Sequence, residues 1–350
     1  MEREITVVAE DKLFAFCSTM LRMAGMPDAD ASYAAHCLVQ TNLWGTDSHG
    51  VIRLPSYIKR LQNGAINPKP TVKVLREVGA VARLHGDDGH GYIVAHKAMA
   101  KAISLAMVHG LGLATVRNSN HFGAAGLFAR EAAEKNMIGI AMSNVYANMV
   151  APGSRHAVIG NNPIAFAVPI PGMRPFVLDF CLSKVALGKL LVAKDKGEKI
   201  PLDWAVDEDG NPTDDPEKGI AGAMLPMAGH KGYGLALVVE MFTGMFSGGA
   251  ILDAIKGMVA NPDEPGETSH TMIAINPLTI MDEDEWEART HALHAKLKET
   301  PMLAGHTIVF PGEPEDAAEI QRRRSGIPVP AATIATLNAL AEPFGVRLEI

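Results

Sequence analysis

The chain has 350 residues, of which 47% are hydrophobic and 20% are charged, a composition typical of a globular protein with one large or two modest domains. Its formal net charge of −7 argues against nucleic acid as a main partner, because phosphate binding requires a basic surface. The single basic run, Arg322-Arg323-Arg324, is short and is interpreted as a solvated helix face.

The first 70 residues have the pattern of helices. Apolar residues at helical spacing predict helices over residues 9–24 and 30–43, and a third helix from about Val51 to Asn63-Gly64. The segment Asn67-Pro68-Lys69-Pro70 then has the composition of a linker. We expect a helical domain of residues 1–70, completed by residues 314–350, where helices are predicted over 315–325 and 331–342.

From residue 71 onward, short apolar segments alternate with longer helical ones. Strands are expected at residues 72–76 and 80–85 (a hairpin around Gly79), 111–117, 137–143, 164–169, 176–180, 271–275 and 306–310. Helices are expected at 92–109, 124–135, from Ser183, 233–246 and 282–299, with an extended excursion at 200–216. This alternation predicts an α/β fold on a mixed sheet over residues 71–313.

Neither the cysteines nor the apolar segments predict export or a membrane span. The three cysteines have no paired spacing, so neither a disulfide framework nor a metal site is expected, and a reduced, cytoplasmic location fits best. The charged N-terminus lacks the apolar core of a signal peptide. Residues 232–255 are apolar, but Glu240 in their middle favours a buried or interface helix over a membrane span.

The segment from Thr46 to Tyr57 places His49 four residues before Arg53. An imidazole exchanges protons near neutral pH, and a guanidinium binds a carboxylate through two parallel hydrogen bonds. A helix starting near Gly50 would stack both side chains on one edge. The alternative is a histidine at a helix cap and an arginine in a surface ion pair.

Three other segments have the composition of ligand-binding loops. Residues 118–126 form a polar junction between a strand and a helix, which either presents backbone N–H groups to a ligand or is a turn capped by Asn120. Residues 229–234 are glycine-rich with a lysine, which suits a phosphate or pyrophosphate but also a flexible turn. Asp179, at a strand end, could bind a ribose or cap a helix. The G-x-G pairs at 89/91, 110/112 and 232/234 lack the third glycine of a Rossmann fingerprint.

Taken in order over residues 10–325, these motifs resemble the malate/L-lactate dehydrogenase type 2 family, which includes ureidoglycolate, sulfolactate and diketogulonate enzymes and the reductase that acts on piperideine-2-carboxylate. The resemblance rests on these segments: Asp47-Ser48-His49-Gly50-Val51-x-Arg53-x-Pro55-x-Tyr57, Ser119-Asn120-His121-Phe122-Gly123, Gly160-x-Asn162-Pro163-x-Ala165-Phe166-Ala167, Leu178-Asp179, Ile200-Pro201, Trp204-Ala205-Val206-Asp207, Gly229-x-Lys231-Gly232-Tyr233-Gly234 and Pro311-Gly312-Glu313.

The resemblance implies a non-Rossmann, NAD(P)-binding core on a mixed sheet, with residues 71–313 binding cofactor and substrate, and a homodimer. It implies that His49 and His121 are the two active-site histidines, either of which could exchange the substrate proton. Ser48 would then orient His49. Arg53 would hold the substrate carboxylate, with Tyr57 one turn further along.

The resemblance also implies the cofactor contacts. These would come from Asn144, Asp179, Phe180, Cys181, His230, Lys231, Gly232, Gly312 and Glu313. Residues 143–149 and Phe180-Cys181-Leu182 depart from the pattern expected of the family, so some contacts there would be made by backbone alone. We expect NAD, with NADP as the alternative, because Lys184 could meet a 2′-phosphate.

The activity implied is reversible hydride transfer between NAD(P) and C2 of a small 2-hydroxy or 2-oxo acid of the malate, lactate, sulfolactate or ureidoglycolate type. One alternative is an imine reductase acting on cyclic 2-imino acids, which needs the same grip on the carboxylate. A second is an acid-binding module without turnover. The partners expected are a small carboxylate and a second copy of the chain, with no nucleic acid and no membrane.

Overall fold

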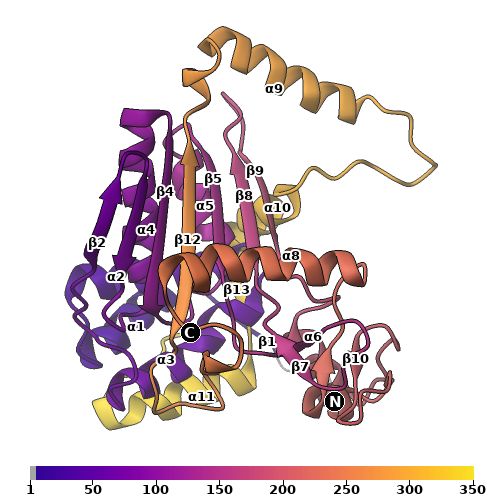
Figure 1. Ribbon diagram of the computed structural model, residues 1–350. Helices are drawn as coiled ribbons and strands as arrows, with labels where there is room; N and C mark the ends of the chain where they lie inside the picture. Colours follow the sequence, from indigo (N-terminus) through magenta and orange to yellow (C-terminus); the bar gives the residue numbers. More distant parts are fainter. Residues whose placement is uncertain (1–4) are drawn as a thin grey trace.

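A computed structural model describes residues 5–350 and is built around a seven-stranded sheet of order β2-β3-β4-β12-β5-β8-β9 (Figure 1). The strands are β2 (Lys73–Val78), β3 (Val81–His85), β4 (Leu111–Ser119), β12 (Thr268–Ile275), β5 (Ile138–Ser143), β8 (Ile164–Val168) and β9 (Phe176–Phe180). Strands β3 and β4 run parallel, and the other neighbouring pairs run antiparallel. The predicted α/β fold on a mixed sheet is therefore confirmed, and its strand directions differ from the mostly parallel Rossmann sheet.

Helices cover both faces of this sheet. Helices α4 (Gly91–His109) and α5 (Gly126–Ala133) pack on one face, while α8 (His230–Glu240) and the π-helical turn Met241–Met245 cross the other (Figure 1). The inner side of α4 is rich in buried alanine, which lets the helix approach the strands closely. Its ends are set by local chemistry, since the His90 side chain accepts from Tyr92 N and Gly110 takes the left-handed conformation that terminates a helix.

The two ends of the chain fold together. Helices α1 (Glu10–Met23), α2 (Asp28–Leu43) and α3 (Leu54–Gln62) pack with α10 (Glu313–Ser325) and α11 (Ala331–Ala341). Strand β1 (Ile5–Val8) pairs antiparallel with β13 (Ile327–Pro330), a two-stranded sheet that the sequence reading missed. The proposed division into residues 1–70 with 314–350 and residues 71–313 stays a prediction.

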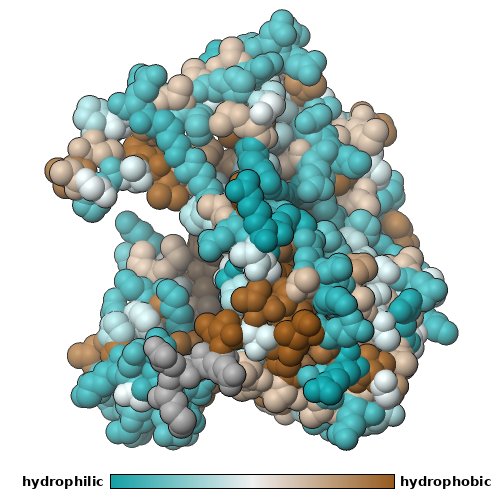
Figure 2. Space-filling model, turned by 180° about the vertical axis from the view of Figure 1, so that it is seen from behind, coloured by the Kyte–Doolittle hydropathy of each residue, from teal (hydrophilic) through white to brown (hydrophobic). Residues whose placement is uncertain are grey.

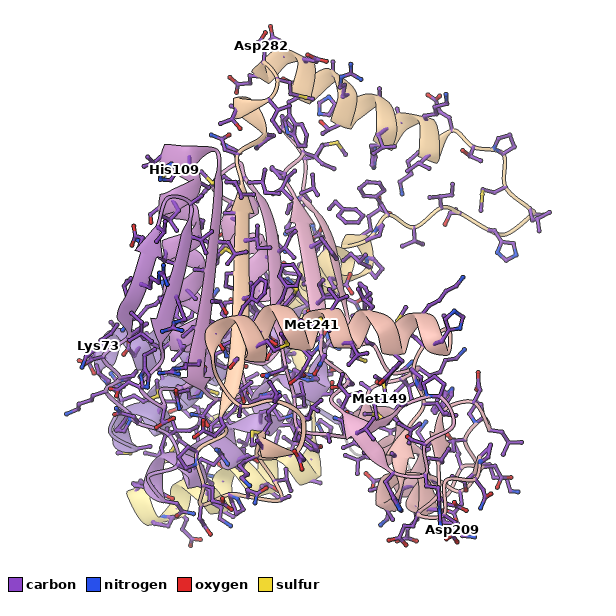
Figure 3. The ribbon with its side chains drawn as sticks, viewed as in Figure 1. Lys73, His109, Met149, Asp209, Met241 and Asp282 are labelled. Atoms are coloured by element: carbon purple, nitrogen blue, oxygen red, sulfur yellow. The ribbon has the colours of Figure 1, made fainter. Side chains whose placement is uncertain are left out.

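A small lobe lies at the lower right of the molecule in Figure 1, below α8. It contains the four-stranded sheet β10 (Ala205–Val206), β11 (Ala223–Met224), β6 (Met149–Val150) and β7 (Ala157–Ile159), with helices α6 (Leu187–Lys196) and α7 (Pro216–Ala221). Met149 and Asp209 mark it in Figure 3. The helix predicted from Ser183 begins only at Leu187, because Ser183 pairs with Pro226 and Lys184 N donates to Leu225 O.

An arm stands off the body on the opposite side, formed by α9 (Glu283–Lys298) and the return segment 299–312 (Figure 1). It starts next to Asp282, labelled in Figure 3, and none of the α9 residues is buried. The strand predicted at 306–310 is wrong. Its last residue packs sideways, with Phe310 against Phe176 and His294, while Phe310 N donates to the Glu313 carboxylate at 2.8 Å instead of to a strand.

Seen from behind, the molecule is deeply hollowed between this arm and the small lobe (Figure 2).

The apolar segment 232–255 holds α8 and the π-helical turn. Glu240 within it is buried and accepts from Asn162 Nδ2 at 2.8 Å and from Leu252 N at 3.0 Å. Over residues 5–350, no helix combines the length and the apolar character that crossing a membrane requires.

Candidate active site

His49 and Arg53 lie in two consecutive 3₁₀ turns, Asp47–His49 and Val51–Arg53, which lead into α3. The predicted helix does begin at Val51, but its first turn is 3₁₀ and the α-helix begins only at Leu54. The Asn42 side chain is the physical reason. Its Oδ1 accepts from Val51 N at 2.8 Å and fills the space beside Gly50, where a Cβ would come within 2.1 Å of it. These contacts hold the segment as turns and keep both functional side chains on one side.

The rings of His49 and His121 stack at a centroid distance of 5.7 Å and an interplanar angle of 21°. A hydroxyl binds each ring, with Ser48 Oγ 2.9 Å from His49 Nδ1 and Tyr57 Oη 2.7 Å from His121 Nδ1. Arg53 lies close enough to lower the pKa of both imidazoles, and its Nε donates to Ser48 O at 2.7 Å. The structure thus brings together all five residues that the sequence assigned to catalysis and substrate binding.

The loop that carries His121 is fixed by its neighbour Asn120. The Asn120 amide donates to Asp88 O and Gly89 O at 2.9 and 3.0 Å, and its Oδ1 accepts from Arg60 Nη2 at 2.9 Å. Helix α4 begins directly beneath this loop, where a Cβ at Gly91 would lie 2.2 Å from His121 O. The loop is therefore a rigid, packed feature of the site and is not a plain turn capped by Asn120.

The surroundings of His49 and His121 favour the neutral form of both imidazoles. Burial, and then the Arg53 charge, lowers the pKa of His49 to about 4. Burial lowers the pKa of His121 well below its ordinary value, with further contributions from His49 and Arg53. Burial also raises the pKa of the Tyr57 phenol, so it stays protonated. An anion bound among these groups would reverse the charge effect and raise both histidine pKa values.

Two other histidines, His90 and His270, are fully buried and predict acid sensitivity. Burial lowers the pKa of His90 and of His270 to about 3, whereas in the unfolded chain each takes up a proton near the ordinary value of 6.5. Between those pH values the unfolded state binds more protons. The free energy of unfolding should therefore fall as the pH is lowered, by up to about 1.4 kcal/mol per pH unit for each histidine. Urea unfolding at several pH values will show whether His90→Asn, which keeps the cap acceptor, flattens this limb. The exposed control His109→Gln should leave it unchanged, and identical limbs in all three proteins would contradict the prediction.

Arg322 on α10 clamps the catalytic turn, a role that the sequence reading missed. Its Nη1 and Nη2 donate to the two Asp47 carboxylate oxygens at 2.6 and 3.0 Å, and Nη1 also donates to Asn42 O at 2.6 Å. The interpretation of Arg322-Arg323-Arg324 as a solvated face is therefore wrong for Arg322. A separation of 275 residues leaves no spacing signal in the sequence that could have found this pair.

We expect Arg322→Ala to lower the free energy of unfolding by about 1–2 kcal/mol, because a two-pronged, half-buried ion pair is lost. It should also lower kcat, because Asp47 precedes Ser48 and His49 directly. Arg324→Ala is the matched control, since Arg324 is exposed on the same helix. Urea unfolding and steady-state kinetics of both variants test this, and equal behaviour of the two would exclude the clamp.

The proposed cofactor residues gather along the outer strand of the sheet, β9. Asp179 Oδ2 accepts from Gly126 N, at the start of α5, at 2.8 Å. Beyond Phe180 and Cys181, Leu182 O accepts from Met227 N at 2.9 Å, which joins this strand end to the loop before α8. At the other end of β9, Val177 N donates to Pro311 O at 3.1 Å and so places Gly312 beside the strand. Three distant segments therefore line one strand, at the hollow seen in Figure 2.

The start of α8 fits an anionic dinucleotide. His230 and Lys231 are exposed in its first turn, at the positive end of the helix. Gly232 is buried, and a Cβ there would lie 2.1 Å from Met227 O, so only glycine allows the turn to pack this closely. A phosphate group would find both a cation and a helix N-terminus there.

Besides Asp179, which accepts from Gly126 N, two more of the proposed cofactor residues already have protein partners. Asn144 is fully buried, with its Oδ1 accepting from Ser269 N at 2.8 Å and its Nδ2 donating to Ala250 O at 3.1 Å. Glu313 accepts from Lys298 Nζ at 2.6 Å and from Phe310 N at 2.8 Å. A cofactor contact at Asn144 would therefore come from backbone, as the departure of residues 143–149 from the family pattern suggested.

Comparison with known proteins shows that the chain is similar to one family over most of its length. A sequence model of the family described as malate/L-lactate dehydrogenase matches residues 8–338. The chain is 38% identical to the L-sulfolactate dehydrogenase of Methanocaldococcus jannaschii (94% of this chain and 95% of the relative) and 36% identical to the malate dehydrogenase of Pyrococcus abyssi (97% and 95%). It is 32% identical to the (2R)-3-sulfolactate dehydrogenase (NADP(+)) of Chromohalobacter salexigens (92% and 94%).

Solved structures agree with these sequence relationships. The sulfolactate dehydrogenase from Methanocaldococcus jannaschii superimposes with a TM-score of 0.92 at 36% identity, covering 98% of both chains. The delta1-piperideine-2-carboxylate reductase from Pseudomonas syringae superimposes with a TM-score of 0.84 at 26% identity, covering 96% of this chain and 100% of the other. The fold is thus shared over nearly the whole length.

Proposed function

Because the chain belongs to the malate/L-lactate dehydrogenase family, it is an oxidoreductase, and we propose that it transfers a hydride reversibly between NAD(P) and C2 of a small 2-hydroxy acid. The observation that carries the proposal is the stacked pair His49 and His121 with Arg53 beside it. This arrangement supplies a proton carrier and a carboxylate-binding cation together, which the oxidation of a carbon next to a carboxylate requires.

Each residue has a defined task in this proposal. The Arg53 guanidinium binds the substrate carboxylate, which orients C2 and its oxygen. One of the two imidazoles removes the hydroxyl proton during oxidation and returns it to the substrate oxygen during reduction. Tyr57 binds the Nδ1 atom of His121, and Ser48 binds the Nδ1 atom of His49. The second ring nitrogen, Nε2, of each imidazole therefore points away from its hydroxyl partner. The nicotinamide, when bound, supplies the group that accepts or donates the hydride.

The charges explain how the site serves both directions. In the free protein the lowered pKa values favour the neutral imidazoles, the form that can take up the hydroxyl proton in oxidation. Reduction needs a protonated donor, and an anionic 2-oxo acid bound to Arg53 would offset the part of the pKa lowering that the guanidinium causes, while the larger effect of burial remains. Proton uptake on binding of the acid follows from this arrangement.

We propose that NAD is the cofactor, held along β9 by residues 179–181, by the first turn of α8 and by Gly312-Glu313. NADP carries an additional 2′-phosphate, and Lys184 was the candidate to bind it. That lysine forms an ion pair with Asp203 at 3.0 Å, which favours NAD. The NADP-dependent relative from Chromohalobacter salexigens makes a direct comparison of both cofactors necessary.

We further propose a homodimer in the cytoplasm. Exposed apolar side chains gather on α8 and the turn after it, namely those of Val238, Met241, Met245 and Phe246, and a second copy could bury them. Met241 lies on this face in Figure 3. The cysteines at 17, 37 and 181 are free, which suits a reducing compartment.

The test is to mix the protein with NADH or NADPH and a panel of 2-oxo acids with methyl, carboxymethyl and sulfomethyl side chains, and to follow the absorbance of the reduced nicotinamide. We expect oxidation of NADH with at least one acid, and the reverse reaction with the matching 2-hydroxy acid. Binding of acids without any turnover would instead indicate the non-catalytic module.

A second candidate is reduction of cyclic 2-imino acids. It is favoured by the similarity to the piperideine-2-carboxylate reductase and needs the same grip of Arg53 on a carboxylate. Adding a cyclic 2-imino acid to the panel separates the two activities, since the higher kcat/KM identifies the substrate class.

A further inference from the structure

His270 is a fully buried histidine to which the proposed reaction gives no role. It lies on β12, the central strand, between β4 and β5. Its Nε2 is 2.8 Å from Ser119 Oγ, at the end of β4, and its Nδ1 is 3.0 Å from Ser143 Oγ, at the end of β5. Its ring stacks on the ring of Phe122, the residue that follows His121, with a centroid distance of 4.6 Å and an interplanar angle of 5°. The side chain therefore connects the ends of the two strands that lead into the His121 loop and into Asn144.

The hydrogen-bond distances favour one position for its proton. Each serine hydroxyl also faces the next backbone carbonyl, with Ser143 Oγ 2.9 Å from Asn144 O and Ser119 Oγ 3.4 Å from Asn120 O. The shorter bond commits the Ser143 hydrogen to Asn144 O, which leaves the Ser143 oxygen to accept from His270. Nδ1 therefore carries the hydrogen. A neutral imidazole has only one N–H, so Nε2 accepts from the Ser119 hydroxyl. The result is a directed chain from Ser119 through His270 and Ser143 to the carbonyl of Asn144.

The side chain acts where the backbone ladder is irregular. The pairing of β12 with β4 shifts register between Thr268 and His270, so that Thr268 pairs with Ser119 while His270 pairs with Val116. The His270 side chain reaches Ser119 across this irregularity and so adds a side-chain connection at the position from which the chain turns to His121.

We propose that His270, as the neutral Nδ1–H tautomer, is a positioning residue that holds the His121 loop and the Asn144 loop in fixed register. The inference rests on the proposed function, in which the first loop carries His121, one of the two candidate proton carriers, and the second carries Asn144, one of the expected cofactor contacts. Its two bonds have separate effects, because the Ser119 side sets the imidazole and the Ser143 side sets the cofactor loop.

Three substitutions separate these effects. His270→Phe keeps the stacking on Phe122 but makes neither bond, and it should lower kcat about ten- to hundredfold, as displaced reacting groups do. His270→Gln places an acceptor near the Nε2 position and should restore most of kcat. His270→Asn places a donor near the Nδ1 position. Compared with His270→Phe, it should bring the Kd for NADH, measured by nicotinamide fluorescence, back to the wild-type value but should not restore kcat.

Thr271→Val is the matched control. Thr271 is the next residue on β12, is equally buried, and loses its hydrogen bonds to Phe242 O and Thr115 Oγ1 in this variant. It should lower stability while leaving kcat within about twofold of the wild type, because these bonds do not reach the catalytic loops. A loss of kcat as large as that of His270→Phe would overturn the positioning role.

Nitrogen-15 NMR of the histidine-labelled full-length protein reads the tautomer without any turnover. The Nδ1–H form at His270 supports the proposal, and the Nε2–H form overturns it. The kinetics distinguish the two levels of inference. A wild-type enzyme active on the acid panel, with a His270→Phe variant of equal kcat, would contradict the positioning role alone. A wild-type protein inactive on the whole panel would contradict the proposed function and the role of His270 with it.

Discussion

Replacing His121 with alanine is expected to lower kcat by about two to four orders of magnitude, the usual contribution of a positioned general acid or base. The imidazole is held at Nδ1 by Tyr57 at 2.7 Å, so its other nitrogen has a fixed direction. The KM for the acid should change much less, because Arg53 remains. Steady-state kinetics in both directions, with the best acid from the panel, measure this.

His49→Ala should also lower kcat strongly, and the comparison decides which imidazole exchanges the proton. The variant that loses the basic limb or acidic limb of the kcat profile, rather than only its height, has lost the titrating group. Tyr57→Phe should have a smaller effect than His121→Ala, since it only frees the ring. His109→Ala is the control, because His109 lies at the far end of α4, away from the site (Figure 3). Wild-type turnover in both active-site variants would refute the assignment.

Arg53→Ala is expected to raise the KM for the acid about ten- to hundredfold, with a smaller effect on kcat. The reason is the loss of charge-assisted hydrogen bonds, which contribute about 1.5–3 kcal/mol when one partner is ionised. The Kd for NADH should stay unchanged, since the cofactor segments lie along β9. Arg53→Lys keeps the charge but not the planar fork, so it should recover only part of the affinity.

A second consequence of removing Arg53 is electrostatic. The guanidinium lowers the pKa of both histidines, so both pKa values should rise in Arg53→Ala, and the pH profile of oxidation should shift upward. Ile52→Ala, at an exposed neighbouring position, serves as the control. An Arg53→Ala variant that loses kcat at unchanged KM would show that the guanidinium does not bind the acid.

The elements that the sequence predicted correctly are those with strong local periodicity. The helices α1, α2 and α4 and the hairpin of β2 and β3 follow from apolar spacing and from glycines at their ends. Short strands escaped because two or three residues carry no periodic signal, as in β6 and β10. The strand predicted at 306–310 shows the converse, since the short apolar run Ile308-Val309-Phe310 has no strand partner within residues 5–350 and packs through Phe310 on Phe176 and His294.

The site was predicted as a set of residues but not as a geometry. Motif order identified His49, Arg53, Tyr57 and His121, yet the turn that joins the first two is set by Asn42, whose role depends on tertiary contact. Arg322 and His270 were missed for the same reason. Their partners lie 275 residues away for Asp47, and 151 and 127 residues away for Ser119 and Ser143, so no local pattern reports them.

The clamp between Arg322 and Asp47 also has a consequence for biosynthesis. The ribosome makes the catalytic turn within the first sixth of the chain, whereas α10 is among the last segments to emerge. Until then Asp47 has no guanidinium to bind, and such long-range contacts form slowly because closing a long loop costs entropy. The turn Asp47–His49 should therefore reach its final geometry only when the chain is nearly complete.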